Sequence, residues 1–442
     1  MNIDATAKRN KLGAAALLTA LAAGPLAGGC GLLEANAGEV LKAEGTEFES
    51  RDIQQTPAQD SAALNDAGLA LVEKIIEKTP ENEPNIVISP LSATLALGML
   101  AEGTSGAAAE ELDQFMGVSG TSRSEALAAW ISHYQQWDRL DEFDPKEPPE
   151  EPILHLANRI TVDDEYEVAQ PLLETLKRYH DAEMGRVDLA SQSGKKALDA
   201  WVKKHTGGMI ERSSVQPDPQ LALVLANAVL FAGRWEDPSR ADETKDRTFT
   251  KADGTKIKVP MMSFSTARAA EKDGWIAVER KYLGGFSAYF ILPPEGKTPA
   301  ELPARESMAL IDEARRVKAP DLYDVRLPKM DLKTSAELIK PLVDLGVRGI
   351  FEGGEALSKI PADTASDLVV SQITQQARLK VDEKGTVAAA VTEVAIEATA
   401  MPPPGTVIKL DRPFIMVIQD DSAKLTLFYA VIGDPTDGGE KR

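Results

Sequence analysis

The spacing of hydrophobic and polar positions changes along the chain between a helical period of 3.6 and a strand period of 2. From about Ser61, apolar residues recur on one helical face. The stretch NIVISPLSATLALGMLAEG predicts a short strand, then Ser89 as N-cap, Pro90 in the first turn and a helix to Gly103. Further helices are expected over 171–180, 193–204 and 335–345, and strands over 223–231, 288–292, 324–327 and 425–432. The absence of a regular βαβ rhythm predicts an α+β fold with large antiparallel sheets.

The stretch VDEKGTVAAAVTEVAIEATAMPPPG, residues 381–405, has a strand pattern that ends in three prolines. From 386 onward the even positions carry no charge, and both carboxylates, Glu393 and Glu397, fall on odd positions. Because side chains alternate across a strand, one face could lie on a core while the other meets water. Ala and Glu also favour helices, so a helix competes with the strand. Pro402 to Pro404 lack amide donors, and the segment therefore ends as an exposed loop.

The N-terminus has the pattern of a secretory signal peptide. Three basic residues precede a short apolar stretch and then small residues, too short for a convincing membrane span. The only cysteine, Cys30, follows directly, and LAGGC resembles the lipid-acceptor site of bacterial lipoproteins, although Ala27 stands where leucine is usual. Alternatively, Cys30 is a chance cysteine beside a plain secretion signal. We expect a signal peptide at 1–29, a flexible tether at 30–60, a folded domain at 61–436 and a tail at 437–442.

Composition and charge exclude several classes of protein. The 442 residues are 43% hydrophobic and 27% charged, as in ordinary globular proteins. A net charge of −20 without a basic stripe argues against nucleic-acid binding. A single cysteine cannot form an intrachain disulfide, so the fold must rest on packing.

Recognisable catalytic chemistry is missing from the sequence. HExxH, GxSxG, Walker and GxGxxG motifs do not occur, and no metal or cofactor is expected. The four histidines, at 133, 155, 180 and 205, are expected to be surface or helix-end residues. A spatial Ser/His/Asp triad stays open, because its members need not be adjacent in sequence.

Seven blocks occur in an order that resembles the serpin family. They are NIVISPLSATLALGMLAEGTSG, NAVLFAGRWEDP, VPMM, YFILPPEG, VRLPKMDL, VDEKGTVAAAVT and LDRPFIMVI. The resemblance covers residues 61–436 and implies the serpin fold, with about eight to nine helices around three β-sheets. It also implies an exposed reactive-centre loop at about 385–405.

The resemblance implies a suicide mechanism of protease inhibition. A target protease cuts the loop, the hinge inserts into sheet A as a new strand, and the acylated protease is carried along and trapped. The hinge would comprise Glu383, Gly385 and Thr386 together with Ala388, Ala389 and Ala390, whose small side chains suit insertion into a formed sheet. Gly385 is expected to supply backbone freedom at the pivot. Val387 replaces the usual glutamate at a position that should point outward.

Polar and aromatic sites of the family also match this sequence. Ser92 and Asn227 match the shutter beneath sheet A, and Trp235 matches the breach, where insertion starts. The shutter histidine of the family is replaced by Gln375 here. Glutamine can still donate and accept hydrogen bonds, but imidazole-dependent opening is in doubt.

The scissile bond is expected at Thr399–Ala400, sixteen residues after the hinge glutamate in the family's spacing. The loop offers no Arg, Lys or aromatic side chain before this bond, so a protease with a shallow pocket, elastase-like or subtilisin-like, fits best. A cysteine protease is the alternative target. We expect a monomer outside the cell or in its envelope, held to a membrane only if Cys30 is lipidated. A non-inhibitory serpin acting as a surface binding or chaperone module is the alternative function.

Overall fold

The computed structural model describes residues 38–79, 84–317, 322–363, 368–386 and 406–438, and we restrict structural statements to these ranges. The described part contains eight α-helices and three β-sheets. The helices are α2 (Ala58–Lys78), α3 (Pro90–Glu102), α4 (Gly106–Met116), α5 (Gly120–Tyr134), α6 (Gln170–His180), α7 (Gln192–His205), α8 (Ala304–Arg316) and α9 (Ile339–Asp344).

The largest sheet, sheet A, has seven strands in the order β1-β4-β3-β5-β14-β13-β12. These strands are β1 (Glu39–Leu41), β3 (Ile153–Asp163), β4 (Met184–Val187), β5 (Leu223–Arg234), β12 (Met330–Glu337), β13 (Val370–Val381) and β14 (Gly385–Thr386). The long central strand β5 pairs antiparallel with β3 on one side and parallel with β13 on the other. The two-residue strand β14 lies between β5 and β13 at one end of their interface.

Sheets B and C complete the strand architecture. Sheet B has the order β2-β17-β16-β10-β9-β8, and sheet C has the order β15-β11-β7-β6. Their strands are β2 (Asn85–Ile88), β6 (Lys245–Thr250), β7 (Lys256–Thr266), β8 (Ala269–Lys272), β9 (Trp275–Lys281), β10 (Phe286–Leu292), β11 (Tyr323–Pro328), β15 (Val407–Lys409), β16 (Phe414–Asp420) and β17 (Thr426–Ile432).

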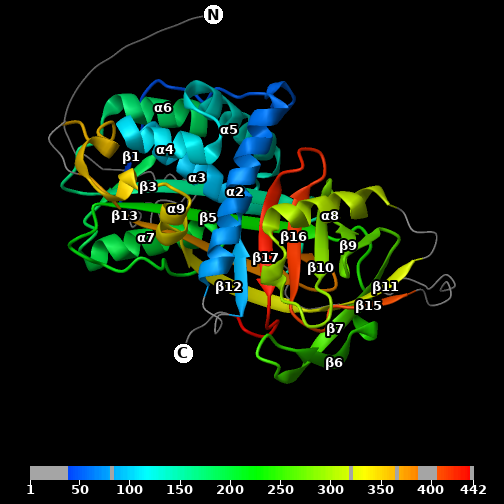
Figure 1. Ribbon diagram of the computed structural model, residues 1–442. Coiled ribbons are helices and arrows are strands. Elements are labelled where there is room, and N and C mark those ends of the chain that lie inside the picture. The colour runs from blue at the N-terminus through cyan, green and yellow to red at the C-terminus, as the bar shows by residue number, and fades with distance from the viewer. Residues whose placement is uncertain (1–37, 80–83, 318–321, 364–367, 387–405, 439–442) are drawn as a thin grey trace, which may run out of the picture.

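The buried helix α3 joins sheets A and B. The Ser89 side chain accepts a hydrogen bond from the Ser92 backbone N–H, and Pro90 occupies the first turn, so the predicted start of this helix is confirmed. Residues 90–101 of α3 are all buried, and the helix contacts β3, β5 and β17. A helix that is apolar on every side belongs inside a core. Figure 1 shows α3 to α6 gathered on one side of sheet A and α7 on the other.

Two expectations from the sequence were wrong in detail. The helix expected over 335–345 begins only at Ile339, because the first of these residues belong to β12 and pair with β13, as in Ser335 opposite Gln376. Strand pairing with β13 outweighs the good helix propensity of Ala336 and Glu337, because propensity is a weak prior that tertiary contacts override. The tether expected up to residue 60 also ends earlier: Glu39–Leu41 form β1 against β4, and α2 starts at Ala58, directly after Pro57.

Candidate functional site

The hinge is a tight turn that links β13 to β14. The Asp382 backbone N–H donates to the Gly385 carbonyl at 2.9 Å, and Asp382 Oδ1 accepts from the backbone N–H groups of Lys384 and Gly385 at 2.9 and 3.3 Å. Burial raises the pKa of the Asp382 carboxyl, while these backbone donors favour its ionised form. One side chain therefore fixes the turn that returns the chain into sheet A.

Gly385 and Thr386 already occupy a place between β5 and β13. Gly385 lies opposite Arg234, and Thr386 lies opposite Gly233 of β5 and Val381 of β13. A Cβ atom at Gly385 would stand 2.1 Å from the Gly233 carbonyl oxygen. Glycine is therefore required here by the close approach of two backbones, although Gly385 does not have a positive φ. The backbone freedom expected of Gly385 at the pivot stays a prediction.

Thr386 points into the protein at the hinge end of this interface. Its side chain is 1% exposed, and its hydroxyl shares a hydrogen bond with the buried hydroxyl of Tyr282. Thr386 belongs to the even positions, which the sequence pattern assigned to the buried face. It is the only residue of that pattern within the described part of the hinge.

The breach is an aromatic and cationic cluster around Trp235. The indole is fully buried, its Nε1–H donates to the Asp382 carbonyl at 2.9 Å, and its ring stacks on Tyr282 with centroids 4.1 Å apart. The Arg280 guanidinium lies 4.3 Å from the indole centroid and donates to the Asp237 carbonyl. Burial lowers the pKa of Arg280 to about 9, and the cation–π contact compensates part of the lost hydration.

Glu383 anchors the outer side of the hinge turn. Its carboxylate accepts from Lys329 Nζ at 2.8 Å and from the Thr244 hydroxyl at 2.7 Å. Burial alone would raise the pKa of Glu383, but these two donors hold it below its ordinary value. The hinge is thereby tied to the residues that directly precede β12 and β6.

The shutter is a polar network beneath the β5–β13 ladder. Gln375 Oε1 accepts from the Ser89 backbone N–H at 2.7 Å, and Gln375 Nε2 donates to the Ser89 carbonyl at 3.1 Å and to Asn227 Oδ1 at 2.6 Å. Asn227 Nδ2 donates to the Ser92 carbonyl at 2.8 Å and to the Asn158 side chain. The network joins β3, β5, β13 and the start of α3, so it closes sheet A at its centre.

The structure brings some of the sequence-derived residues together and leaves others undescribed. Glu383, Gly385 and Thr386 adjoin Trp235, while Gln375, Asn227 and Ser92 meet in the shutter. Reasoning from sequence missed seven contributors: Asn158, Thr244, Arg280, Tyr282, Lys329, Asp382, and Ser89 as a shutter partner. The remaining candidates lie outside the described residues: Cys30, Ala388, Ala389, Ala390, Thr399 and Ala400.

One expectation about the histidines was wrong. His155 lies within β3, is buried, and is paired on both ring nitrogens, because β3 runs beneath the end of α7. His180 and His205 are the last residues of α6 and α7, so the helix-end position expected for histidines is confirmed for these two. Within the described ranges, no group of three or more His, Cys, Asp or Glu side chains is arranged to hold a metal ion.

Comparison with known proteins agrees with this architecture. The family model described as "Serpin (serine protease inhibitor)" matches residues 62–435. Mouse alpha-1-antitrypsin 1-1 is 29% identical over 398 residues, covering 88% of this chain and 93% of the relative. A rat serine protease inhibitor is 30% identical over 384 residues, covering 85% and 88% of the two chains.

Solved structures give the same result. The thermophilic serpin tengpin in its native state superposes with a TM-score of 0.78 at 24% identity, covering 90% of this chain and all of tengpin, which shows the fold. Native protease nexin-1 with heparin has a TM-score of 0.72 at 26% identity, covering 86% of this chain. The chain belongs to the serpin family, a family of serine protease inhibitors and not of enzymes. None of the described helices is long and apolar enough to cross a membrane.

Proposed function

We propose that this chain inhibits serine proteases as a suicide substrate. The observation that carries the proposal is the position of β14: two hinge residues lie between β5 and β13, while direct β5–β13 pairing stops at Ala228 opposite Gln376. An interface that is closed at one end and entered by the hinge at the other is suited to accept a further strand.

The register of β14, if it is continued along the sheet, supports the proposal. Continuing the β14–β5 pairing one residue at a time places Thr392 opposite Asn227, and continuing the β14–β13 pairing places the same Thr392 opposite Gln375. Gln375 and Asn227 are themselves direct partners in the present ladder. Thr392 would therefore enter between them, where its hydroxyl can replace the amide–amide hydrogen bond that is lost.

The same register agrees with the alternation in the sequence. Even positions after Thr386 would face the side of β5 that carries Leu225, Val229 and Phe231, which belong to the main core. The uncharged even positions would thus be buried, and Glu393 would lie on the other face with α7. The register would end at Ile396 opposite Leu223, the first residue of β5.

We place the chemistry at Thr399–Ala400. The protease serine Oγ attacks the Thr399 carbonyl, an ester bond forms, the peptide bond breaks and Ala400 leaves as a free amine. Hydrolysis of the ester would release a merely cleaved protein. Insertion of the loop before hydrolysis drags the ester-linked protease along sheet A and distorts its active site, so that deacylation stalls.

The loop sequence favours proteases with small primary pockets. Ile396, Glu397, Ala398 and Thr399 precede the bond, and none offers a cation or a large ring. We therefore assign elastase-like or subtilisin-like proteases as targets, with a cysteine protease as the alternative. Cys30 is assigned as a lipid acceptor that holds the inhibitor, as a monomer, on a bacterial cell envelope, with plain secretion as the alternative.

Incubation with a protease panel tests this function. Pancreatic elastase and subtilisin should each give an SDS-stable complex one protease mass larger, and trypsin should not. Mass spectrometry of the released peptide should show a new N-terminus at Ala400. A start at Met401 would move the bond by one residue, and a start before Ala398 would mean that the loop alignment is wrong. Cleavage without a complex by every protease would favour the binding or chaperone alternative.

A further inference from the structure

The helix α7 and the segment after it, together residues 192–214, form a strap across sheet A. On one side, Trp201 of α7 packs on Ala157 of β3 and on Ala226 and Ala228 of β5. On the other side, β13 side chains hold the following segment. Gln376 donates to the Arg212 carbonyl at 3.1 Å and accepts from the Ser214 N–H at 3.0 Å, and Arg378 donates to the Met209 carbonyl at 2.9 Å.

The strap therefore crosses the interface into which the loop would insert. Asp199 of α7 accepts from the Ser213 backbone N–H at 2.7 Å, so the helix and its following segment are bonded to each other. A strand entering between β5 and β13 separates the two attachment sites of the strap. Either the bonds to β13 or the attachment to β3 must yield.

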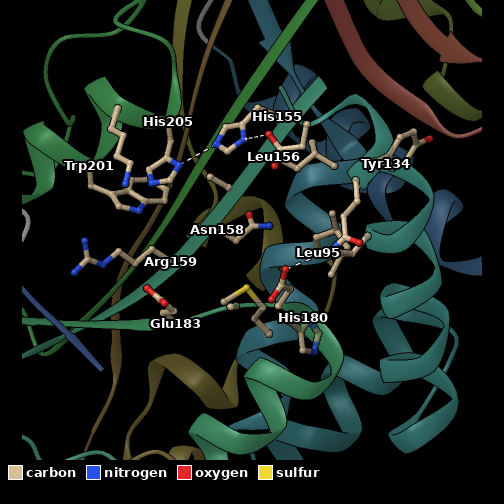
Figure 2. A pocket seen from close by; sticks show the side chains of 18 of the residues that line it. Leu95, Tyr134, His155, Leu156, Asn158, Arg159, His180, Glu183, Trp201 and His205 are labelled. Carbon is tan, nitrogen blue, oxygen red and sulfur yellow. Dashed lines mark hydrogen bonds and ion pairs between the residues drawn. The ribbon is translucent and has the colours of Figure 1, made fainter. Parts of the chain in front are cut away.

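A histidine pair makes the polar attachment of α7 to β3. His155 Nε2 of β3 lies 2.8 Å from Nδ1 of His205, the last residue of α7, and the two rings are stacked with centroids 5.1 Å apart. The Trp201 ring packs against the His205 ring, with the two ring centroids 4.8 Å apart. Asp138, which follows α5, lies 2.7 Å from His155 Nδ1. Figure 2 shows the two rings facing each other above Arg159.

The proton positions in this pair follow from its partners. A carboxylate only accepts hydrogen bonds, so His155 Nδ1 carries the hydrogen that bonds Asp138. The neutral His155 ring then has a bare Nε2, and His205 Nδ1–H donates to it. The contact of 2.8 Å between His155 Nε2 and His205 Nδ1 needs one donor and one acceptor. The pair can keep this hydrogen bond with one added proton, but with two added protons both facing nitrogens carry hydrogens and the bond is lost.

The surroundings of the His205 ring disfavour its protonation. Burial, followed by the positive charges of His155, Lys204 and Arg159, lowers the pKa of His205 to about 3. A lowered pKa means that the fold favours the neutral ring. The stability that this ring contributes is therefore complete above pH 6.5 and is lost progressively as the pH falls from 6.5 towards 3. Acid thus opposes the attached state at His205.

Water has access to the pair through a cavity of about 630 Å³ at the edge of β3. The cavity lies where β3 extends beyond its pairing with β4, which covers only residues 160–163. Lys42 and Glu183 form an ion pair of 2.7 Å on its wall. The titratable and charged groups that line this cavity together with the two histidines are Lys42, Tyr134, Asp138, Arg159, His180, Asp181, Glu183 and Lys204.

We propose that His155 and His205 form an acid-released tie between β3 and α7, so that acidification frees the strap and eases opening of sheet A. The release of α7 is a property of the uncleaved protein. Its effect on the rate of loop insertion rests on the proposed function.

Hydrogen exchange of the uncleaved, protease-free protein tests the tie. Exchange is measured at pH 7.5 and 5.0 and corrected for the intrinsic pH dependence of amide exchange. Protection of α7 amides should fall roughly tenfold or more at pH 5.0, while α8, which lies over sheet B, serves as the internal reference. An equal change of amide protection in α7 and α8 would overturn the proposal, and this comparison needs only the wild-type protein.

Matched variants assign the effect to the pair. His205→Gln keeps a side chain that can donate to His155 but does not titrate, so its α7 protection should lose the pH dependence. Lys203→Gln alters an exposed neighbouring charge and should behave as wild type. A His205→Gln protein with the full wild-type pH dependence would contradict the proposal. Absence of protease complexes together with acid release of α7 would refute the proposed function and leave the tie intact.

Discussion

Gln375 and Asn227 face each other across the parallel ladder between β13 and β5, and Gln375 Nε2 donates to Asn227 Oδ1 at 2.6 Å. Both side chains are almost fully buried. The bond crosses the interface that must open for a strand to insert. It is therefore the polar contact in the shutter that most directly distinguishes the closed sheet from an expanded one.

Removing the Asn227 amide should weaken the closed state. Asn227→Ala deprives Gln375 of an acceptor and Ser92 of a donor, and unsatisfied buried polar groups cost about 1–3 kcal/mol. The midpoint of urea-induced unfolding should fall accordingly. Gln372→Ala, on the same strand as Gln375 but only half-buried, is the matched control and should change the midpoint little. Equal effects of the two substitutions would show that the shutter bond does not hold the sheet.

Stability should depend on pH through Glu383. The pKa of this carboxyl is lowered from 4.5 in the fold, so its contribution is complete above pH 4.5 and is lost as the pH falls through the lowered value. Glu383→Gln should be less stable than wild type at pH 7, and the difference should shrink toward pH 3. Asp382, whose pKa is raised by burial and in part by the charge of Glu383, has the opposite sign, and its smaller contribution also changes in the variant. A difference that stays constant with pH would exclude the ion pair with Lys329 as its cause.

A charge at Thr386 should convert the inhibitor into a substrate. The side chain of Thr386 is buried beside Tyr282, so Thr386→Arg would place a cation in the core or keep the hinge out of the sheet. The variant should still be cleaved by elastase but should form little SDS-stable complex. Val387→Arg, on the parity expected to point outward, is the control and should retain complex formation. Comparable complex yields from both variants would refute the buried role of Thr386.

Lipidation of Cys30 would decide the location of the protein. The native protein should partition into detergent-rich fractions, and Cys30→Ala should release it or leave the precursor uncut. Mass spectrometry of the mature N-terminus measures both the cleavage and the modification. A water-soluble protein with an unmodified Cys30 would establish plain secretion.

Local signals made much of the fold predictable. Ser89 and Pro90 identified the start of α3 because capping depends on neighbouring residues, and the strands near 223, 288 and 425 follow from continuous apolar runs. Ser335 was assigned to a helix because its strand pairing with Gln376 is a long-range contact that no local pattern encodes.

The candidate site also has a part that local sequence predicts and a part that depends on tertiary contacts. The hinge glycine was recognisable, but its physical reason depends on packing against β5, whose Gly233 carbonyl oxygen would stand 2.1 Å from a Cβ atom at Gly385. The His155–His205 pair joins residues 50 positions apart, and Lys329 meets Glu383 only in the folded chain. Residues that act through tertiary contacts leave no signature in their own sequence neighbourhood.

The thermal midpoint before and after loop cleavage tests the central claim most directly. Cleavage by a non-target protease within residues 397–401 frees the hinge, and the inserted strand would add ladder hydrogen bonds and buried apolar surface along β5 and β13. We predict a rise in the midpoint of at least about 10 °C for the cleaved protein. An unchanged or lowered midpoint would contradict insertion and, with it, the inhibitory mechanism.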